Sequence, residues 1–113
     1  MRLEGKSAIV TGAGNGIGKA IAELFASEGA SITVAELEDG PGHATVDTIN
    51  ASGGTAVFQQ TDISDEASVE AMVAAATAAH GNVNILVNNA AAFVFGTVED
   101  VTDADWNRVL GVN

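Results

Sequence analysis

The most constraining feature of this chain is a glycine-rich segment that separates a short apolar run from an amphipathic one. Residues 11–18 read Thr-Gly-Ala-Gly-Asn-Gly-Ile-Gly and follow the apolar run at residues 7–10. This order predicts a strand, a tight turn and the start of a helix. Glycine lets the backbone N–H groups of such a turn approach phosphate oxygens, and the helix dipole attracts their charge. The segment therefore predicts a nucleotide phosphate site, with backbone N–H groups from Gly14 to Ile17 as donors.

Two common phosphate-binding patterns do not fit this segment. The P-loop requires a serine or threonine after its Gly-Lys pair, and Ala20 follows Lys19 here. The dinucleotide pattern Gly-x-Gly-x-x-Gly meets Ile17 when it starts at Gly12, and Lys19 when it starts at Gly14. The pattern that does fit is Thr-Gly-x3-Gly-x-Gly.

Short apolar runs alternate with longer helical patterns along the chain, which is typical of parallel strands joined by helices. We expect strands at residues 7–11, 31–35, 56–60 and 84–88, and helices at residues 17–28, 41–51, 65–80 and from 102 onward. The predicted fold class is α/β with a parallel sheet.

Two details of the predicted helices can be checked against a structure. Ile17, Ile21, Leu24 and Phe25 share one face of the first helix, and we expect that face to pack on the sheet. Ser64 precedes the third helix in the position of an N-cap, where a hydroxyl accepts a hydrogen bond from a free backbone N–H group.

The composition excludes several classes of partner. Fifteen acidic residues against four basic ones give a formal net charge of -11, which repels nucleic acids and anionic membrane surfaces. The sequence has no cysteine, which rules out disulfides and thiolate metal ligands. We therefore expect no nucleic-acid partner, no membrane partner and no metal site, and a cytoplasmic location.

Glu36 ends the second predicted strand and is the candidate selector of the cofactor. A carboxylate about 20 residues beyond such a turn accepts hydrogen bonds from the adenosine ribose hydroxyls of NAD. The same carboxylate repels the 2′-phosphate of NADP, and neither Asn15 nor Leu37 supplies a compensating positive charge. NAD is therefore expected over NADP. The alternative is a solvated strand end, because Glu38 and Asp39 follow.

The turn pattern, with Asp62-Ile63 after the third strand and Asn88-Asn89-Ala90-Ala91 after the fourth, resembles the short-chain dehydrogenase/reductase family of classical type. The resemblance covers essentially the whole chain. It implies a Rossmann-like doubly wound parallel sheet in strand order 3-2-1-4, with helices on both faces. Residues 1–113 are then the N-terminal part of an NAD(P)-binding domain. It also implies an oxidoreductase that transfers a hydride between NAD(H) and an alcohol or ketone, with a homo-oligomeric full-length form.

The resemblance assigns roles to single residues. It places Asp62 at the adenine, Asn88 and Ala90 along the cofactor groove, and Asn113 as the catalytic asparagine. Local alternatives remain open: a turn for Asp62, a tie between loops for Asn88 and Asn89, and a helix end for Asn113. The candidate cofactor-binding residues are Gly12, Gly14, Asn15, Gly16, Ile17, Gly18, Glu36, Asp62, Ile63, Asn88 and Ala90.

The proton-transfer residues of this family are not found in the sequence. Members use a serine and a Tyr-x3-Lys motif on the substrate, and this sequence contains no tyrosine. We therefore expect a truncated chain that is inactive alone and that associates through the open edge of its fourth strand. The alternative is a nonenzymatic NAD- or adenine-nucleotide-binding module, or a half-domain that pairs with a partner chain.

Overall fold

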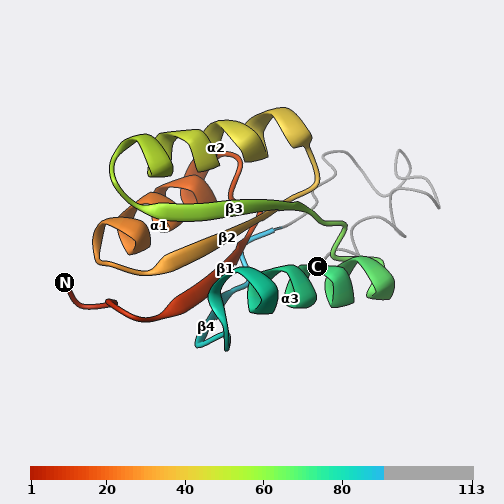
Figure 1. The fold of residues 1–113 in the computed structure, drawn as a ribbon. Helices are drawn as coiled ribbons and strands as arrows, with labels where there is room; N and C mark the ends of the chain where they lie inside the picture. The colour runs from red at the N-terminus through yellow and green to blue at the C-terminus, as the bar shows by residue number, and fades with distance from the viewer. Residues whose placement is uncertain (91–113) are drawn as a thin grey trace.

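The structure is a computed structural model that describes residues 1–90. The predicted fourth helix, Ala91 and Asn113 lie outside the described residues. Strands and helices alternate along the described part (Figure 1). They are β1 (Ser7–Thr11), α1 (Gly16–Ser27), β2 (Ser31–Glu36), α2 (Asp39–Ala51), β3 (Thr55–Gln60), α3 (Glu66–His80) and β4 (Ile85–Val87).

The four strands form one parallel sheet in the order β3-β2-β1-β4, which confirms the predicted topology. The register pairs Thr11 of β1 with Ala35 of β2, and Glu36 of β2 with Gln60 of β3. Because the strands are parallel, their carboxyl ends lie at the same edge of the sheet. Glu36 and the glycine-rich turn that follows Thr11 are therefore neighbours at that edge.

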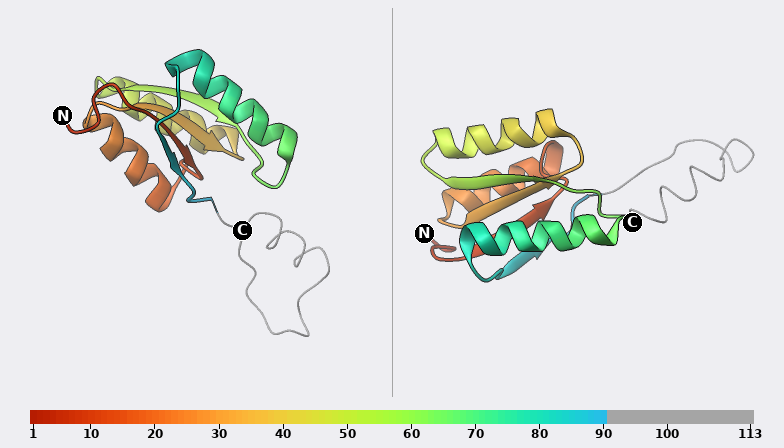
Figure 2. Two further views of the ribbon diagram at one scale, coloured as in Figure 1. Left: turned by 90° about the horizontal axis from the view of Figure 1, so that it is seen from below. Right: turned by 45° about the vertical axis from the view of Figure 1, so that its right-hand side comes forward.

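The sheet is covered on both faces, with α1 and α2 on one side and α3 on the other (Figure 2). All five residues of β1 are buried, as expected for a strand between two helical layers. The α1/α2 side holds the larger apolar cluster, which includes Val10, Ile32 and Val34, whereas the α3 side is built around Ile9 and Met72. No helix within residues 1–90 is long and apolar enough to cross a bilayer.

The face that α1 turns to the sheet differs from the predicted one. Ile17 and Leu24 are 73% and 59% exposed, while Ile21 and Phe25 are only partly buried against the apolar cluster. The residues of α1 that are buried are Gly18, Ala22 and Ala26. This stripe of small residues lets the helix backbone approach the sheet closely, which large side chains would prevent. The prediction assumed that the face with the largest apolar side chains packs on the sheet. In the structure, the close approach of the α1 backbone to the sheet decides which face is buried.

The start of α3 corrects a second expectation. Asp65 is the N-cap, and its carboxylate accepts a hydrogen bond from the N–H group of Ala67 at 3.1 Å. Ser64 does not cap the helix, because its hydroxyl donates to Asp62 Oδ1 at 2.6 Å. The nearby aspartate holds the serine in the preceding turn, which leaves Asp65 to satisfy the helix end.

Candidate nucleotide-binding site

The glycine-rich turn lies at the carboxyl end of β1 and is bonded to both neighbouring strands. On the β2 side, the N–H group of Gly12 donates to the carbonyl of Ala35 at 2.8 Å. On the β4 side, the Thr11 hydroxyl accepts from the N–H groups of Asn89 and Ala90 at 3.0 and 3.1 Å, and donates to the Val87 carbonyl at 3.2 Å. Thr11 is a residue that the sequence analysis did not single out, although its buried hydroxyl joins the two strand ends.

Gly12 and Gly18 are required by contacts within the protein. A Cβ on Gly12 would lie 2.9 Å from Ala90 Cα, and its φ of +65° also disfavours other residues. A Cβ on Gly18 would collide with the Gly12 carbonyl group and with the side-chain amide of Asn89. These two glycines therefore let α1 and the segment after β4 close over the turn.

Gly14 and Gly16 differ in what surrounds them. A Cβ on Gly14 would lie 2.6 Å from Glu36 Oε1 and 2.8 Å from Pro41 Cβ, so Gly14 is also needed for internal packing. Gly16 has a φ of +56°, and no atom lies within 4 Å of the position that its Cβ would take. Of the four glycines between residues 12 and 18, Gly16 alone borders open space within the described structure. A phosphate has room to approach the turn at that point.

The N-terminus of α1 presents free hydrogen-bond donors at the same place. Asn15 occupies the N-cap position in an extended conformation, but its side chain makes no capping hydrogen bond. The first turn of α1 contains no acidic residue, and Asn15, Gly16 and Ile17 are exposed. The first N–H groups of a helix have no partner within the helix, and together with the dipole they attract an anion. Residues 15–18 therefore fit a phosphate group.

Glu36 faces this turn, and its carboxylate is held by three backbone donors. Oε1 accepts from the N–H group of Gly14 at 2.9 Å, and Oε2 accepts from those of Leu37 and Glu38 at 2.8 and 3.2 Å. The prediction that the Gly14 N–H group faces a ligand is therefore wrong, because Glu36 uses that donor. A half-buried carboxylate of fixed orientation stands beside the phosphate site instead.

Asp62 and Ile63 lie in the turn after β3, next to the end of β2. The N–H group of Thr61 donates to the Glu36 carbonyl at 3.0 Å, which joins the two strand ends. Asp62 Oδ1 accepts from both the hydroxyl and the N–H group of Ser64, and these bonds lower the pKa of Asp62, the hydroxyl having the larger effect. Asp62 therefore stabilises the turn through Oδ1, as the local alternative expected. Its contact with adenine stays a prediction.

Asn88 and Ala90 border the turn on its other side. Asn88 is exposed, and Ala90 is fixed by the bond from its N–H group to Thr11. The predicted tie between loops is made by Asn89, whose side-chain amide donates to the Gly12 carbonyl at 3.3 Å. The structure thus brings the turn, Glu36 and residues 88–90 together, with Asp62 farther along the same edge.

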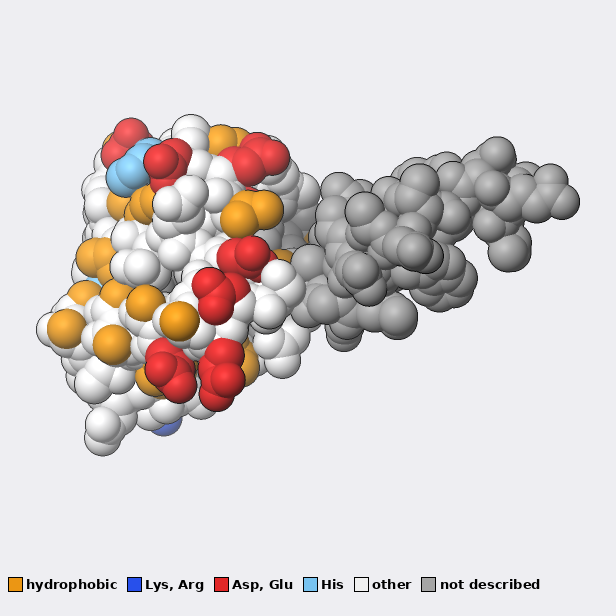
Figure 3. All heavy atoms as spheres, turned by 90° about the vertical axis from the view of Figure 1, so that its right-hand side faces the viewer, with side chains coloured by type: hydrophobic (Ala, Val, Ile, Leu, Met, Phe, Trp, Pro, Cys, Tyr) orange, Lys and Arg blue, Asp and Glu red, His pale blue; other side chains and the backbone are white. Residues whose placement is uncertain are grey.

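Among the charged side chains visible at the carboxyl ends of the strands, acidic ones predominate (Figure 3). Lys19 is the cation nearest to the turn in sequence, and its Nζ lies 4.0 Å from Glu23 Oε1, one helical turn along α1. Within residues 1–90, no group of three or more His, Asp or Glu side chains is placed to hold a metal ion. The charge at this edge opposes an additional phosphate beside Glu36.

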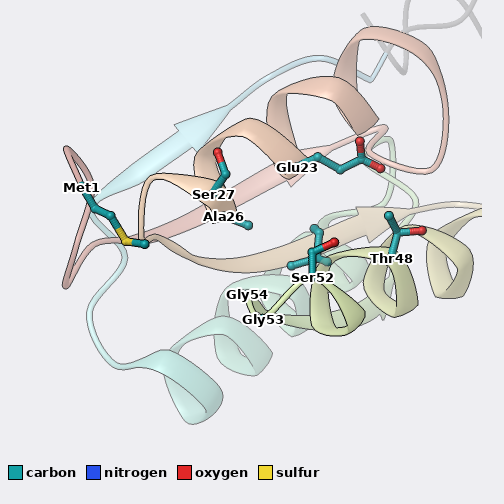
Figure 4. Close-up of a pocket in the computed structure, with 9 residues that line it drawn as sticks. Met1, Glu23, Ala26, Ser27, Thr48, Ser52, Gly53 and Gly54 are labelled. Atoms are coloured by element: carbon teal, nitrogen blue, oxygen red, sulfur yellow. The ribbon is translucent and has the colours of Figure 1, made fainter.

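A pocket of about 330 Å³ lies at the opposite end of α1, between the C-terminal halves of α1 and α2 (Figure 4). Ser27 at the end of α1 and Ser52 just after α2 line it, and Met1 lies beside it. None of the predicted site residues lines this pocket. The candidate site lies at the N-terminal end of α1, and the pocket is not part of it.

The fold and the glycine turn define a class of nucleotide-binding α/β protein, and comparison with known sequences specifies the family. The family model described as short chain dehydrogenase matches residues 6–113. The chain belongs to this family of oxidoreductases. An uncharacterized oxidoreductase of Methylorubrum extorquens is 40% identical over 99% of this chain and 46% of its own length. The chain therefore spans less than half the length of that relative.

Solved structures agree with this assignment. A short-chain dehydrogenase/reductase from Burkholderia phymatum in complex with NAD superimposes with a TM-score of 0.95 and 39% identity, over 99% of this chain and 40% of the other. A metagenomic short-chain oxidoreductase in complex with NADP gives a TM-score of 0.92 and 34% identity, over 99% of this chain and 51% of the other. Both nicotinamide cofactors thus occur among similar proteins.

Proposed function

We propose that this chain supplies the adenosine- and pyrophosphate-binding part of the NAD site of a short-chain dehydrogenase. The observation that carries the proposal is the Glu36 carboxylate, held 2.9 Å from the Gly14 N–H group beside the open N-terminus of α1. A pyrophosphate on the N–H groups of residues 15–18 places the adenosine ribose toward the end of β2. The fixed carboxylate then accepts hydrogen bonds from the ribose hydroxyls.

The reaction that we propose for the whole protein is hydride transfer between NAD(H) and an alcohol or ketone. The cofactor supplies the hydride chemistry, and the chain supplies binding and orientation. Asn113 remains our candidate for the catalytic asparagine. The 113 residues contain no tyrosine to act as a phenolic proton donor, so we expect them to be inactive by themselves. An assay with NAD and a panel of secondary alcohols tests this expectation.

The preference for NAD over NADP follows from charge. A 2′-phosphate bound at the ribose would lie beside Glu36, on a surface rich in other carboxylates. Two like charges about 4 Å apart repel by about 4 kcal/mol at an effective dielectric constant of 20, and solvent reduces this value at a partly exposed site. Lys19 is directed toward Glu23 and does not offset the repulsion.

Calorimetric titration of the chain with NAD, NADP and ADP-ribose tests the proposed site directly. We expect ADP-ribose and NAD to bind with similar weak affinity, because the adenosine half makes the proposed contacts, and NADP to bind more weakly. Failure of all three ligands to bind the folded chain would contradict the proposed site.

Glu36→Arg tests the role of the carboxylate. We expect the affinity for NAD relative to NADP to fall by at least about tenfold, because like-charge repulsion becomes attraction. Glu38→Arg is the matched control, since it makes the same change of charge two residues away on an exposed side chain. An equal effect of both substitutions would show that overall charge, and not Glu36, selects the cofactor.

A second candidate function is a half-domain that pairs with a partner chain. It is favoured by β4, which pairs only with β1 in the described sheet and carries Leu86 with 52% of its surface exposed. An apolar side chain on a short edge strand suits addition of a further strand. Sedimentation over a range of protein concentrations tests whether the chain associates with itself.

A further inference from the structure

The glycine-rich turn has a second attachment, which comes from α2. The Thr45 hydroxyl donates to the carbonyl of Ala13 at 2.9 Å, across 32 positions of sequence. Thr45 and Ala13 are both completely buried. The sequence analysis missed Thr45, since a threonine within a helix of thin apolar character gives no signal of its own.

This bond acts on the same peptide group as Glu36. The Ala13 carbonyl and the Gly14 N–H group belong to one planar peptide unit. Thr45 holds the carbonyl end at 2.9 Å, and Glu36 Oε1 holds the N–H end at 2.9 Å. Rotation of this unit would break both bonds. The peptide therefore links the position of α2 to the orientation of the carboxylate.

The helix that carries Thr45 is itself fixed against the sheet. Gly42 of α2 contacts the ring of Phe58 on β3, leaving no space for a side chain at that position. The rings of His43 and Phe58 lie 4.5 Å apart. Pro41 packs against Gly14 at the start of the helix. These contacts fix the part of α2 that carries Thr45.

A purely local role does not explain the geometry of Thr45. Threonine in a helix commonly donates to the carbonyl four residues earlier, as Thr48 does to Ala44 at 3.0 Å. For Thr45 the corresponding distance to the Pro41 carbonyl is 3.2 Å, longer than the 2.9 Å to Ala13. A hydroxyl has one proton, so the shorter bond goes to the turn. Valine would fill this buried position without a polar group to satisfy.

We propose that Thr45 is a positioning residue for cofactor selection, because its bond to the Ala13–Gly14 peptide fixes the Glu36 carboxylate at the ribose. This inference rests on the proposed NAD site. It adds that discrimination against NADP depends on a residue that does not touch the cofactor. Loss of the Thr45 hydroxyl frees the peptide and with it the Gly14 bond to Oε1, which leaves the carboxylate held only through Oε2 by Leu37 and Glu38. The carboxylate then moves more freely, and its repulsion of a 2′-phosphate weakens.

The test compares Thr45→Val with Thr45→Ser in the 113-residue chain, with Thr48→Val as the control. The first readout is hydrogen exchange of the Gly14 amide without ligand, measured by NMR. We expect Thr45→Val to speed this exchange by about tenfold relative to the control, the effect of losing about one buried hydrogen bond. Thr45→Ser keeps the hydroxyl and is expected to stay near the parent rate. Equal exchange in Thr45→Val and Thr48→Val overturns the proposal.

The second readout is the ratio of NADP to NAD dissociation constants. We expect this ratio to fall about threefold to tenfold in Thr45→Val and to recover in Thr45→Ser. Faster exchange with an unchanged ratio refutes the link to selection. If the parent chain binds neither dinucleotide, the proposed NAD site fails and selection fails with it. The exchange result still decides whether Thr45 fixes the Ala13–Gly14 peptide. Thr45→Ala replaces Thr45→Val, with the same expectations, if the valine variant does not fold.

Discussion

The two flanks of β1 are built in different ways. On one side, β2 and β3 have six residues each, and β2 buries Ile32, Val34 and Ala35 between the helical layers. On the other side, β4 has three residues, and none of them is fully buried. The β2 flank is stabilised mainly by apolar packing. On the β4 flank, the Thr11 hydroxyl donates to Val87 and accepts from Asn89, whose side-chain amide donates to the Gly12 carbonyl. The proposed adenosine side of the site therefore rests on the longer and more deeply buried strands.

The largest effect is expected at the junction between the turn and the β4 flank. In Gly18→Ala, the new Cβ would lie 2.9 Å from the Gly12 carbonyl carbon and would also collide with the Asn89 amide. We expect a loss of about 2–3 kcal/mol in the free energy of unfolding, because a methyl group is forced into a closely packed contact. Urea denaturation measures this loss, and exchange of the Asn89 amide shows whether the β4 flank separates first.

Gly40→Ala is the matched control for that substitution. Gly40 lies in the first turn of α2, has no atom within 4 Å of its Cβ position, and does not have a positive φ. We expect the free energy of unfolding to rise by up to about 1 kcal/mol, since alanine favours the helix. If both alanine variants destabilise the chain equally, close packing at Gly18 is not the cause.

An intermediate effect is expected at the exposed edge of β4. In Leu86→Lys, a charged side chain replaces an apolar one that is 52% exposed. If the chain associates through this edge, its dissociation constant should rise about tenfold, because a lysine opposes burial of the strand in a contact. Analytical ultracentrifugation measures the change.

Leu24→Lys tests whether association depends on the β4 edge or on exposed apolar surface in general. Leu24 is 59% exposed and belongs to α1 rather than to a strand. We expect little change in association from this variant. Equal weakening by both lysine substitutions would mean that exposed apolar surface, rather than the β4 edge, drives the contact.

Local periodicity predicted the alternation of strands and helices, glycine spacing predicted the location of the turn, and the family resemblance implied the strand order. The sequence also placed Glu36 at the strand end nearest to the turn. It failed where a contact joins distant segments. The bond from Thr45 to Ala13 and the small-residue face of α1 depend on how closely two elements approach, and no local pattern encodes that distance.

The prediction that the Gly14 N–H group donates to a ligand was wrong for a related reason. Spacing shows that a backbone N–H group lies in the turn, but not which group accepts from it. The side chain that does so comes from the next strand. A motif therefore locates a binding turn. Which of its N–H groups bond within the protein and which face a ligand depends on the folded chain.

The smallest effect is expected at the far end of the β2–β3 flank, at Asp62. The Ser64 hydroxyl holds the pKa of this carboxyl below its ordinary value of 3.8, so the folded chain favours the charged form. The resulting stabilisation is fully present above about pH 4 and is lost as the pH falls through the lowered pKa. Asp62 is partly exposed, so we expect Asp62→Asn to cost less than about 1 kcal/mol at neutral pH.

Denaturation of the parent chain and of Asp62→Asn between pH 7 and pH 2 measures this dependence. The difference in unfolding free energy should shrink toward the acid end, because protonation abolishes the charge that the Ser64 hydroxyl stabilises. Ser64→Ala should reproduce the same dependence, since it removes the donor from the other side of the bond. A difference that stays constant with pH would assign the Asp62 effect to turn geometry alone.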